Sequence, residues 1–358
     1  MKIGILTHQY VSNYGAFLQA YALAKAVSGE FPEDTVEIID YINLKHFITN
    51  SLGWFRFYRD REQWKHWKQK IRVPFVFARE RKKHLPLSPR CYTAKGINRL
   101  QYDVIIVGSD EVWNYKDRKS TAKVKFGHGL TCKKLIAYAP SVGNSRGDIP
   151  EYVRKGLDNF CAISVRDELT GKLVKRVTGQ EPDSVLDPTF LQEIPVAEPE
   201  EEQKPYVLFY YCDGLPEDIK DQIISHVRQE GLAVYGAGQW DRQYDDIQKL
   251  LTPFEWVQMF RHARFVFTGT FHGAVFSILN RRPFKVYLTN KSRIRKVGAL
   301  LKELRIEGRK IDADFVFDIN EASNEIDYSA VDEIITQRRN ESLEFLRKAI
   351  ESARSTER

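Results

Sequence analysis

The chain has 358 residues, of which 42% are hydrophobic and 29% are charged. This balance is that of a globular protein and excludes a disordered chain. No run of about eighteen apolar residues exists that would predict a membrane-spanning helix. Lys and Arg (55) outnumber Asp and Glu (48), which gives a net charge of +7. The N-terminal apolar run turns polar at Thr7, too early for a signal peptide core, and the four cysteines form no C-x-x-C pair. We therefore expect a cytoplasmic protein without a metal site or a disulfide framework.

The first forty residues predict a strand, a helix and a second strand. Lys2 to Thr7 is a short apolar run, a polar turn follows at 12–15, and residues 16–23 are rich in helix formers. Val36 to Ile39 predicts the next strand, and the β-α-β order predicts a parallel sheet with a right-handed crossover. Further apolar runs at 103–108, 134–138 and 162–166 are typical of strands covered on both faces.

Residues 46–100 interrupt this pattern, and the stretch 54–85 within them is both basic and aromatic. It contains eleven Lys or Arg residues and three Asp or Glu residues, so its net charge is +8. Such a segment can lie on an anionic membrane surface or hold a lipid-phosphate substrate. It can also be an inserted pair of helices that packs its aromatic rings on the N-terminal lobe of the protein and exposes its charges to solvent. Nucleic acid is not expected as a partner, because no RNA- or DNA-binding motif accompanies the charge.

A polar, proline-punctuated stretch at 195–204 marks the expected domain boundary. Beyond it we predict strands at 206–211, 232–235, 265–267 and 284–288, helices at 218–228, 254–262, 273–279 and 294–304, and a long amphipathic helix at 331–353. The expected fold is therefore α/β with two doubly wound lobes. The first lobe comprises residues 1–194 with a helical insertion at 46–100, the second comprises residues 205–328, and a C-terminal helix occupies 329–358. Sheets of this kind bind ligands at the carboxyl ends of their strands.

The sharpest candidate site is T-G-T-F-H-G at 268–273, between a predicted strand and a predicted helix. This position places His272 at the start of the helix, where backbone N–H groups and a partial positive charge favour a phosphate or carboxylate. The imidazole can donate to an anion or shuttle a proton near neutral pH. The alternative is a histidine that only caps a turn. Gly269 and Gly273 either let a ligand approach the backbone or serve packing.

Two further strand ends carry polar side chains. Arg166 follows the apolar run at 162–165, and its guanidinium matches carboxylate and phosphate geometry; the alternative is a surface pair with Asp167 or Glu168. In G-S-D-E-V-W-N at 108–114, Asp110 or Glu111 could accept a proton from a hydroxyl, and Trp113 could stack on a sugar face. The alternative there is Ser109 or Asp110 capping a helix.

Several of these segments together resemble the polysaccharide pyruvyl transferase family. The matching stretches run in family order over roughly residues 1–290: K-I-G-I-L-T at 2–7, N-Y-G-A-F-L-Q-A-Y-A-L at 13–23, V-G-S-D-E-V-W-N at 107–114, S-V-R-D at 164–167, L-D-P-T at 186–189 and F-H-G at 271–273. The resemblance implies a glycosyltransferase-B-like fold, in which two Rossmann-like lobes are joined by a C-terminal helix that crosses back to the first. It also implies transfer of the enolpyruvyl unit of phosphoenolpyruvate onto two hydroxyls of a sugar, which gives a cyclic pyruvate ketal in exopolysaccharide or cell-envelope biosynthesis.

The resemblance also implies roles for individual residues. His272 and Arg166 match the histidine and arginine that hold the donor. We expect Thr270 and Gly273, which lie beside the histidine, to contact the donor as well. Many members carry an arginine two positions before that histidine, where Thr270 stands here, so we name Lys291, Arg293 and Arg295 as replacements. His272 is the expected proton donor, and Asp110 or Glu111 the expected base. For the acceptor, the expected residues are Asn13, Tyr14, Gly15 and Trp113.

No metal or cofactor is required by this chemistry, in which phosphoenolpyruvate is the donor substrate. The acceptor would be a sugar of a polysaccharide or a lipid-linked repeat unit, which would give a membrane-facing segment at 54–85 a purpose and place the protein at the inner face of the membrane. Two alternatives stay open. One is a nucleotide-sugar glycosyltransferase that uses the Gly236-Ala237-Gly238 turn and His272 for a diphosphate. The other is a non-catalytic adaptor in envelope assembly.

Overall fold

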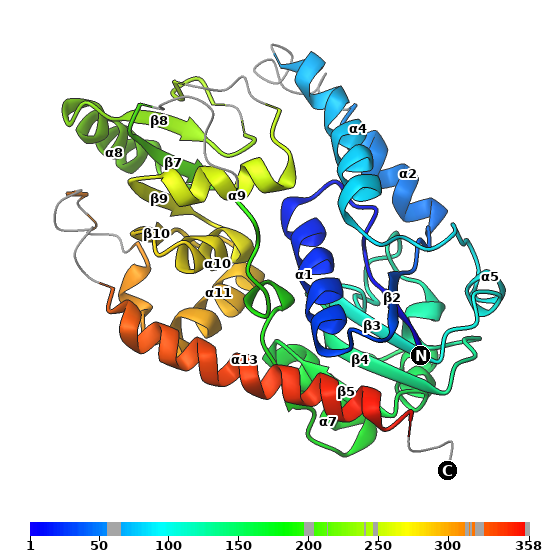
Figure 1. Cartoon of the computed structure of the whole chain (residues 1–358). Coiled ribbons are helices and arrows are strands. Elements are labelled where there is room, and N and C mark those ends of the chain that lie inside the picture. The colour runs from blue at the N-terminus through cyan, green and yellow to red at the C-terminus, as the bar shows by residue number, and fades with distance from the viewer. Residues whose placement is uncertain are drawn as a thin grey trace. The chain divides into compact units, whose positions relative to one another are not determined.

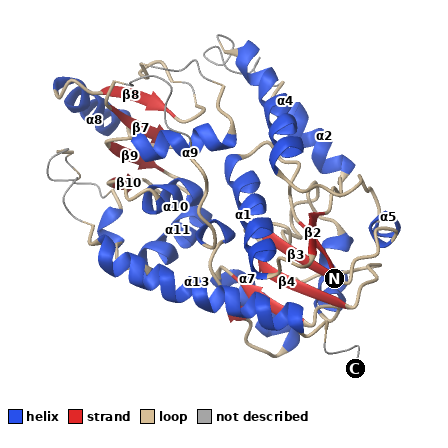
Figure 2. Ribbon diagram, viewed as in Figure 1, coloured by secondary structure: helices blue, strands red, loops and turns tan. Residues whose placement is uncertain are grey.

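The computed structural model contains the whole chain, and it describes residues 1–55, 66–196, 204–212, 214–239, 241–245, 250–311, 315, 317–318 and 326–354. The chain divides into two compact units. The first consists of Met1–Trp54, Pro74–Ile194 and Thr336–Arg358, and the second of Phe55–Val73 and Pro195–Ile335. In each unit a parallel sheet lies among helices (Figures 1 and 2).

The first unit is built on a sheet of six parallel strands in the order β2-β1-β3-β4-β5-β6. The strands are β1 (Lys2–Leu6), β2 (Thr35–Ile38), β3 (Val104–Asp110), β4 (Lys134–Pro140), β5 (Ala162–Val165) and β6 (Asp183–Ser184). Ile5 of β1 lies opposite Ile38 on one side and Ile106 on the other. The central strands are buried along almost their whole length, as expected for a parallel sheet covered on both faces.

Helices lie around the sheet of the first unit (Figure 1). They are α1 (Tyr14–Glu30), α2 (Leu44–Gly53), α5 (Ala94–Asn98), α6 (Glu151–Leu157) and α7 (Glu168–Thr178), with short 3-10 turns η2 (Lys123–Phe126) and η3 (Pro188–Phe190). Helix α4 (Trp67–His84) crosses the division between the units at Pro74. Asn13 caps α1 by accepting from the Ala16 N–H at 3.0 Å, and Asp167 caps α7 from the Thr170 N–H at 3.0 Å.

The second unit repeats the plan with four parallel strands in the order β10-β9-β7-β8. Its strands are β7 (Tyr206–Tyr210), β8 (Ala233–Gly236), β9 (Phe265–Thr268) and β10 (Phe284–Val286). Its helices are α8 (Glu217–Gln229), α9 (Pro253–His262), α10 (Phe271–Leu279) and α11 (Lys291–Glu303), followed by the 3-10 turn η4 (Glu307–Arg309). Stacked rings of Phe209 and Phe267, 5.0 Å apart, lie in its core.

The last helix, α13 (Tyr328–Glu351), belongs to both units. At its start, the Tyr328 hydroxyl donates to the Arg282 carbonyl at 3.0 Å in the second unit. Further along, the Ser342 hydroxyl accepts from the Leu186 N–H at 2.9 Å, and Arg347 pairs with Glu30 at 2.6 Å in the first unit. The predicted α/β fold, with two Rossmann-like lobes and a C-terminal helix that crosses back to the first, is confirmed. Among the residues that the structure describes, no helix is both long enough and apolar enough to cross a bilayer.

Candidate active site

Each sheet has one position where the chain reverses the direction in which it adds strands. In the first sheet, β1 lies between β2 and β3, and in the second, β7 lies between β8 and β9. In open α/β sheets, ligands bind at the carboxyl ends of the strands at such a position. Among the predicted site residues, Asp110 is the last residue of β3 and Thr270 comes two residues after the end of β9, which puts both at these strand ends.

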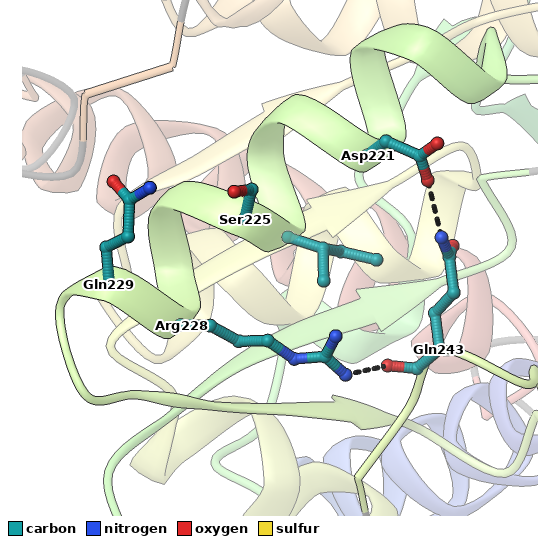
Figure 3. Close-up of a pocket in the computed structure, with 6 residues that line it drawn as sticks. Asp221, Ser225, Arg228, Gln229 and Gln243 are labelled. Carbon is teal, nitrogen blue, oxygen red and sulfur yellow. Dashed lines mark hydrogen bonds between the residues drawn. The ribbon is translucent and has the colours of Figure 1, made fainter.

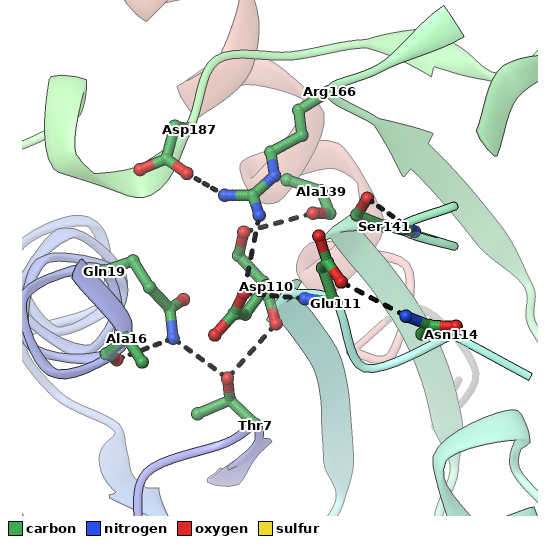
Figure 4. Close-up of polar contacts among 12 residues, drawn as sticks. Thr7, Ala16, Gln19, Asp110, Glu111, Asn114, Ala139, Ser141, Arg166 and Asp187 are labelled. Atoms are coloured by element: carbon green, nitrogen blue, oxygen red, sulfur yellow. Dashed lines mark hydrogen bonds and ion pairs between the residues drawn. The ribbon is translucent and has the colours of Figure 1, made fainter. Parts of the chain in front are cut away.

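Arg166 lies at the end of β5 between two carboxylates (Figure 4). Its Nη1 donates to Asp187 Oδ2, and its Nη2 lies 3.7 Å from Asp110 Oδ1. The arginine side chain is 8% exposed and that of Asp187 is fully buried. A surface pair with Asp167 or Glu168 is therefore wrong, because Asp167 caps α7 and the guanidinium points to residues that are distant in sequence. One cation and two carboxylates leave this group with a formal charge of −1.

Asp187 is the partner that sequence reasoning missed. Its Oδ1 accepts from the Thr189 N–H at 3.1 Å and from the Thr189 hydroxyl at 2.7 Å, while its Oδ2 accepts from Arg166. Both carboxylate oxygens are thus engaged by donors, which is what a buried charge requires. The L-D-P-T stretch at 186–189 contains this carboxylate, but nothing in the sequence pairs it with an arginine 21 residues earlier.

Asp110 and Glu111 sit where β3 leaves the sheet. Asp110 Oδ1 accepts from the Glu111 N–H at 2.7 Å, and Glu111 Oε2 accepts from the Asn114 amide at 3.2 Å. The described residues 111–122, which come after β3, form turns and no helix, so the capping alternative for Ser109 and Asp110 is wrong. Gly108 has a φ of +128°, and a Cβ there would lie 2.0 Å from the Tyr138 carbonyl oxygen. Only glycine allows the neighbouring strands to approach so closely at this point.

Trp113 does not face a ligand. The ring is fully buried, stacks on Phe126 with ring centres 5.6 Å apart, and donates its Nε1–H to the Lys125 carbonyl at 2.8 Å. The prediction that Trp113 stacks on a sugar is wrong, because both its polar atom and its faces are used inside the core. At the start of α1, Asn13 serves as the helix cap, Tyr14 packs on Phe77 at 5.2 Å, and Gly15 is buried and offers an acceptor no surface.

A buried basic cluster lies beside the carboxyl end of β1. Lys125 Nζ contacts His8 Nε2, the His8 and His46 rings are 5.1 Å apart, and the Tyr10 hydroxyl lies 2.9 Å from His46 Nδ1. Burial lowers the pKa of Lys125 to about 7, opposed by Asp110 and Asp117, and it lowers the pKa of His46 to about 4. Burial, reinforced by the Lys125 charge, holds the pKa of His8 well below its usual value, so neutral His8 accepts from the lysine. Sequence reasoning missed this cluster because 117 residues separate His8 from Lys125.

His272 occupies the second position of α10, as predicted. Thr270 is the N-cap and accepts from the Gly273 N–H at 3.0 Å, while its own N–H donates to Thr268 Oγ1 at 3.2 Å. A Cβ at Gly273 would lie 2.0 Å from that Thr268 oxygen, so this glycine allows the helix to pack on the end of β9. The half-buried His272 ring lies beside Phe271, 5.4 Å away between ring centres. The cap and the close packing of this turn therefore fix the position of the His272 backbone at the start of α10.

Gly269 brings the neighbouring strand ends close to this turn. A Cβ at this position would lie 2.3 Å from the Tyr211 carbonyl oxygen, 2.8 Å from that of Tyr287 and 3.5 Å from Arg293 Nη1. The Arg293 guanidinium therefore lies beside the turn that carries His272. Arg293, one of the residues named above as a replacement for the missing arginine, therefore lies at this turn.

The segment around His272 is strongly biased toward positive charge. From Trp256 to Lys302 the sequence contains no Asp or Glu and ten Lys or Arg residues. Lys291, Arg293 and Arg295 fall in the first turns of α11, where the helix dipole is positive. Cations at that end of a helix each cost about 0.3–1 kcal/mol, so the arrangement favours a bound anion.

The glycine turn after β8 does not offer its backbone to a diphosphate. The Ala237 N–H donates to the Phe209 carbonyl at 3.1 Å and the Gly238 N–H to the Gly236 carbonyl at 2.9 Å. A Cβ at Gly236 would also strike the Tyr244 ring, so packing explains this glycine. A hollow on α8 is lined by Asp221, Arg228 and Gln243, but these residues already pair with one another, since Arg228 donates to the Gln243 carbonyl at 3.0 Å (Figure 3).

Residues 13–290 match the model of the family described as polysaccharide pyruvyl transferase. The match covers most of the chain, so the protein belongs to this family of transferases. No curated protein is detectably similar to the chain.

Solved structures with a similar outline include glycosyltransferases and epimerases. Spinosyn rhamnosyltransferase SpnG is 10% identical, with 98% of this chain and 100% of that chain covered and a TM-score of 0.44. The glycosyltransferase SnogD from Streptomyces nogalater is 11% identical, with 99% of each chain covered and a TM-score of 0.42. The UDP-GlcNAc 2-epimerase from Methanocaldococcus jannaschii is 9% identical, with 94% and 92% covered and a TM-score of 0.45.

Proposed function

We propose that the protein transfers the enolpyruvyl unit of phosphoenolpyruvate onto two hydroxyls of one sugar in a polysaccharide or lipid-linked repeat unit. The methylene carbon of the donor takes up a proton, and C2 becomes an oxocarbenium-like centre. One hydroxyl attacks C2 and gives up its proton, the C2–O bond to phosphate breaks, and the second hydroxyl attacks and gives up its proton. The products are a cyclic ketal and inorganic phosphate, and no electron is gained or lost by an outside partner.

The observation that carries this proposal is the positive, acid-free segment around His272. Phosphoenolpyruvate combines a carboxylate with a phosphate, whose charge near neutral pH is about −1.5 to −2. Arg293 beside the turn, Lys291 and Arg295 on the same helix end, and the N-terminus of α10 supply charge of the opposite sign. Family membership supports the donor, and this charge pattern supports its place in the second unit.

The chemical roles follow from side-chain type and position. His272 donates the proton to the methylene carbon, since imidazole is suited to proton transfer near neutral pH. Asp110, the last residue of β3, or Glu111 next to it accepts the proton of the attacking hydroxyl. Arg166 orients Asp110 across 3.7 Å and is proposed as a further donor ligand, although its charge is already opposed by two carboxylates. Asn13 and Tyr14, at the start of α1, are the proposed contacts to the acceptor.

Proton NMR tests the reaction directly. Galactosides and mannosides are incubated with the protein and phosphoenolpyruvate, and a new ketal methyl singlet with stoichiometric phosphate release is expected. Failure to form a ketal with either sugar class and with a lipid-linked repeat unit, while phosphoenolpyruvate also gives no binding signal, contradicts the proposal.

Thermal shift separates the donor classes. Phosphoenolpyruvate is expected to raise the melting temperature, whereas stabilisation by UDP or GDP alone would favour a nucleotide-sugar glycosyltransferase. Arg293→Ala is expected to abolish most of the shift with phosphoenolpyruvate. Arg261→Ala is the matched control, because Arg261 is a half-buried arginine of the same unit in the last turn of α9, before β9 begins.

A further inference from the structure

Helix α2 presents large apolar side chains to solvent. Leu44, Ile48 and Leu52 are 55%, 52% and 50% exposed, and Phe47 is 36% exposed. Residues four apart lie on one face of a helix, so the three aliphatic side chains form a continuous stripe and Phe47 lies at its edge. Single exposed apolar residues are ordinary, but an exposed apolar stripe marks an interaction surface.

The opposite face of α2 is held on the first unit by polar contacts. His46 is 9% exposed and meets the Tyr10 hydroxyl at 2.9 Å, and Asn43 caps the helix while its amide donates to the Thr121 carbonyl at 3.2 Å. An amphipathic helix of a globular protein normally turns its apolar face to the core. In α2 a histidine faces inward and the aliphatic side chains face outward. The contacts of His46 and Asn43 with the first unit therefore hold the helix in the orientation that exposes the stripe.

A hollow adjoins this stripe at the start of α2. It has a volume of about 480 Å³, and Leu44 and Lys45 of α2 line it together with Tyr92 and Lys123. No carboxylate is among its lining residues. The apolar stripe is therefore continuous with a concave, positively charged surface that suits a phosphate group carried next to an apolar chain.

The surroundings of α2 are basic. The sequence has no Asp or Glu from Tyr41 to Arg59. In the first unit, α4 contributes exposed Lys82 and Lys83, and its Arg81 donates to the Tyr10 carbonyl at 2.6 Å. Because Tyr10 also contacts His46 and Phe47 of α2, both helices are anchored on the same residue. Exposed positive charge thus accompanies the apolar stripe.

We propose that the outer face of α2, with the adjoining hollow, docks on an anionic phospholipid bilayer. Aliphatic side chains of such a helix enter the boundary between headgroups and acyl chains, and nearby lysines and arginines add attraction to anionic headgroups. A second copy of the chain fits less well, because a two-fold contact would place the same basic surface against itself. This docking concerns where the protein works and is separate from the ketal transfer proposed above.

Vesicle flotation without any substrate tests the docking. The wild-type chain is expected to float with vesicles that contain phosphatidylglycerol, to float poorly with phosphatidylcholine vesicles, and to be released by salt. The triple variant Leu44→Gln, Ile48→Gln, Leu52→Gln is expected to bind at least about tenfold more weakly. Ile294→Gln is the matched control, since Ile294 is 48% exposed on α11 of the second unit and should leave flotation unchanged.

Three results overturn the docking proposal. One is a wild-type protein that does not float with anionic vesicles, and another is a triple variant that floats as well as the wild type. The third is a concentration-dependent dimer in sedimentation velocity that the triple variant abolishes, which would assign the stripe to a second copy. Circular dichroism and the melting temperature establish that the variant is folded. Ketal formation on a water-soluble sugar, measured without vesicles, keeps a failure of docking distinct from a failure of the proposed reaction.

Discussion

The carboxyl edges of the two sheets handle charge in opposite ways. In the first unit, Arg166 is matched by Asp110 and Asp187, and buried Lys125 donates to His8. In the second unit, the turn that carries His272 lies in a 47-residue segment, 256–302, without any carboxylate. At one edge the cations have partners within a polar network, while the sequence around the other edge carries positive charge only. The comparison supports the proposal that the first edge positions groups and the second binds the anionic donor.

The largest expected effect is on the reaction, at the edge of the second unit. His272→Gln keeps a polar side chain of similar reach but cannot supply the proton that the methylene carbon needs. We expect ketal formation to fall by about 10²–10⁴-fold, the usual contribution of one general acid, with little change in the free energy of unfolding. Turnover by NMR and urea denaturation measure the two quantities. A His272→Gln variant with a lower free energy of unfolding but a normal rate of ketal formation would contradict this role for His272.

The matching change at the edge of the first unit should affect stability most. Asp187→Asn removes one charge from a buried ion pair and leaves Arg166 without its closest counter-charge. Breaking such a pair costs about 3–5 kcal/mol, which urea denaturation will show. Asp167→Asn is the control, because asparagine is an equally good N-cap and the free energy of unfolding should change by less than about 0.5 kcal/mol. Equal losses of unfolding free energy in the two variants would mean that the buried ion pair contributes no more to stability than the helix cap does.

The order and type of the elements could be predicted from sequence because local signals agree with the fold. The apolar runs that became β3, β4 and β9 are each buried on both faces, and α1, α7 and α10 begin after the polar residues Asn13, Asp167 and Thr270. These signals are carried by neighbouring residues. They therefore fix strands, helices and the positions of strand ends, and with them the locations of Asp110, Arg166 and His272.

What the sequence could not supply were contacts between distant residues. Trp113 lies in a motif with polar neighbours. Its hydrogen bond to the Lys125 carbonyl and its stacking on Phe126 show that it belongs to the core. Asp187 is the partner of Arg166 although Asp167 is adjacent in sequence. No periodicity encodes such choices, because they depend on how separate strands are ordered in the sheet.

Buried Lys125 of the first unit also predicts that the free energy of unfolding depends on pH. The pKa of Lys125 is about 7 in the fold, whereas an unfolded lysine has a pKa of about 10.4. Between these values the unfolded chain binds the proton and the folded chain does not, so stability rises with pH by up to about 1.4 kcal/mol per pH unit. Lys125→Met should remove this rise between about pH 7 and 10, as measured by urea denaturation at several pH values.

Lys123→Met is the control for this measurement. Lys123 is exposed in the same 3-10 turn, so its loss should leave the pH dependence as it is in the wild type. If both variants keep the rise in stability, Lys125 is protonated in the folded chain throughout this range and the buried cluster carries a full extra charge.

The smallest expected effect concerns the cap that sets the direction of His272. Thr270→Ala removes the hydroxyl that accepts from the Gly273 N–H, which should cost about 1 kcal/mol of unfolding free energy. Thr252→Ala removes the corresponding cap of α9, where the hydroxyl accepts from the Glu255 N–H at 3.2 Å, and should cost about the same. Since only Thr270 lies in the turn that carries His272, only its variant should also weaken phosphoenolpyruvate binding in thermal shift or calorimetry. Equal donor affinity in the two variants would show that the anion is held by the α11 cations without help from the start of α10.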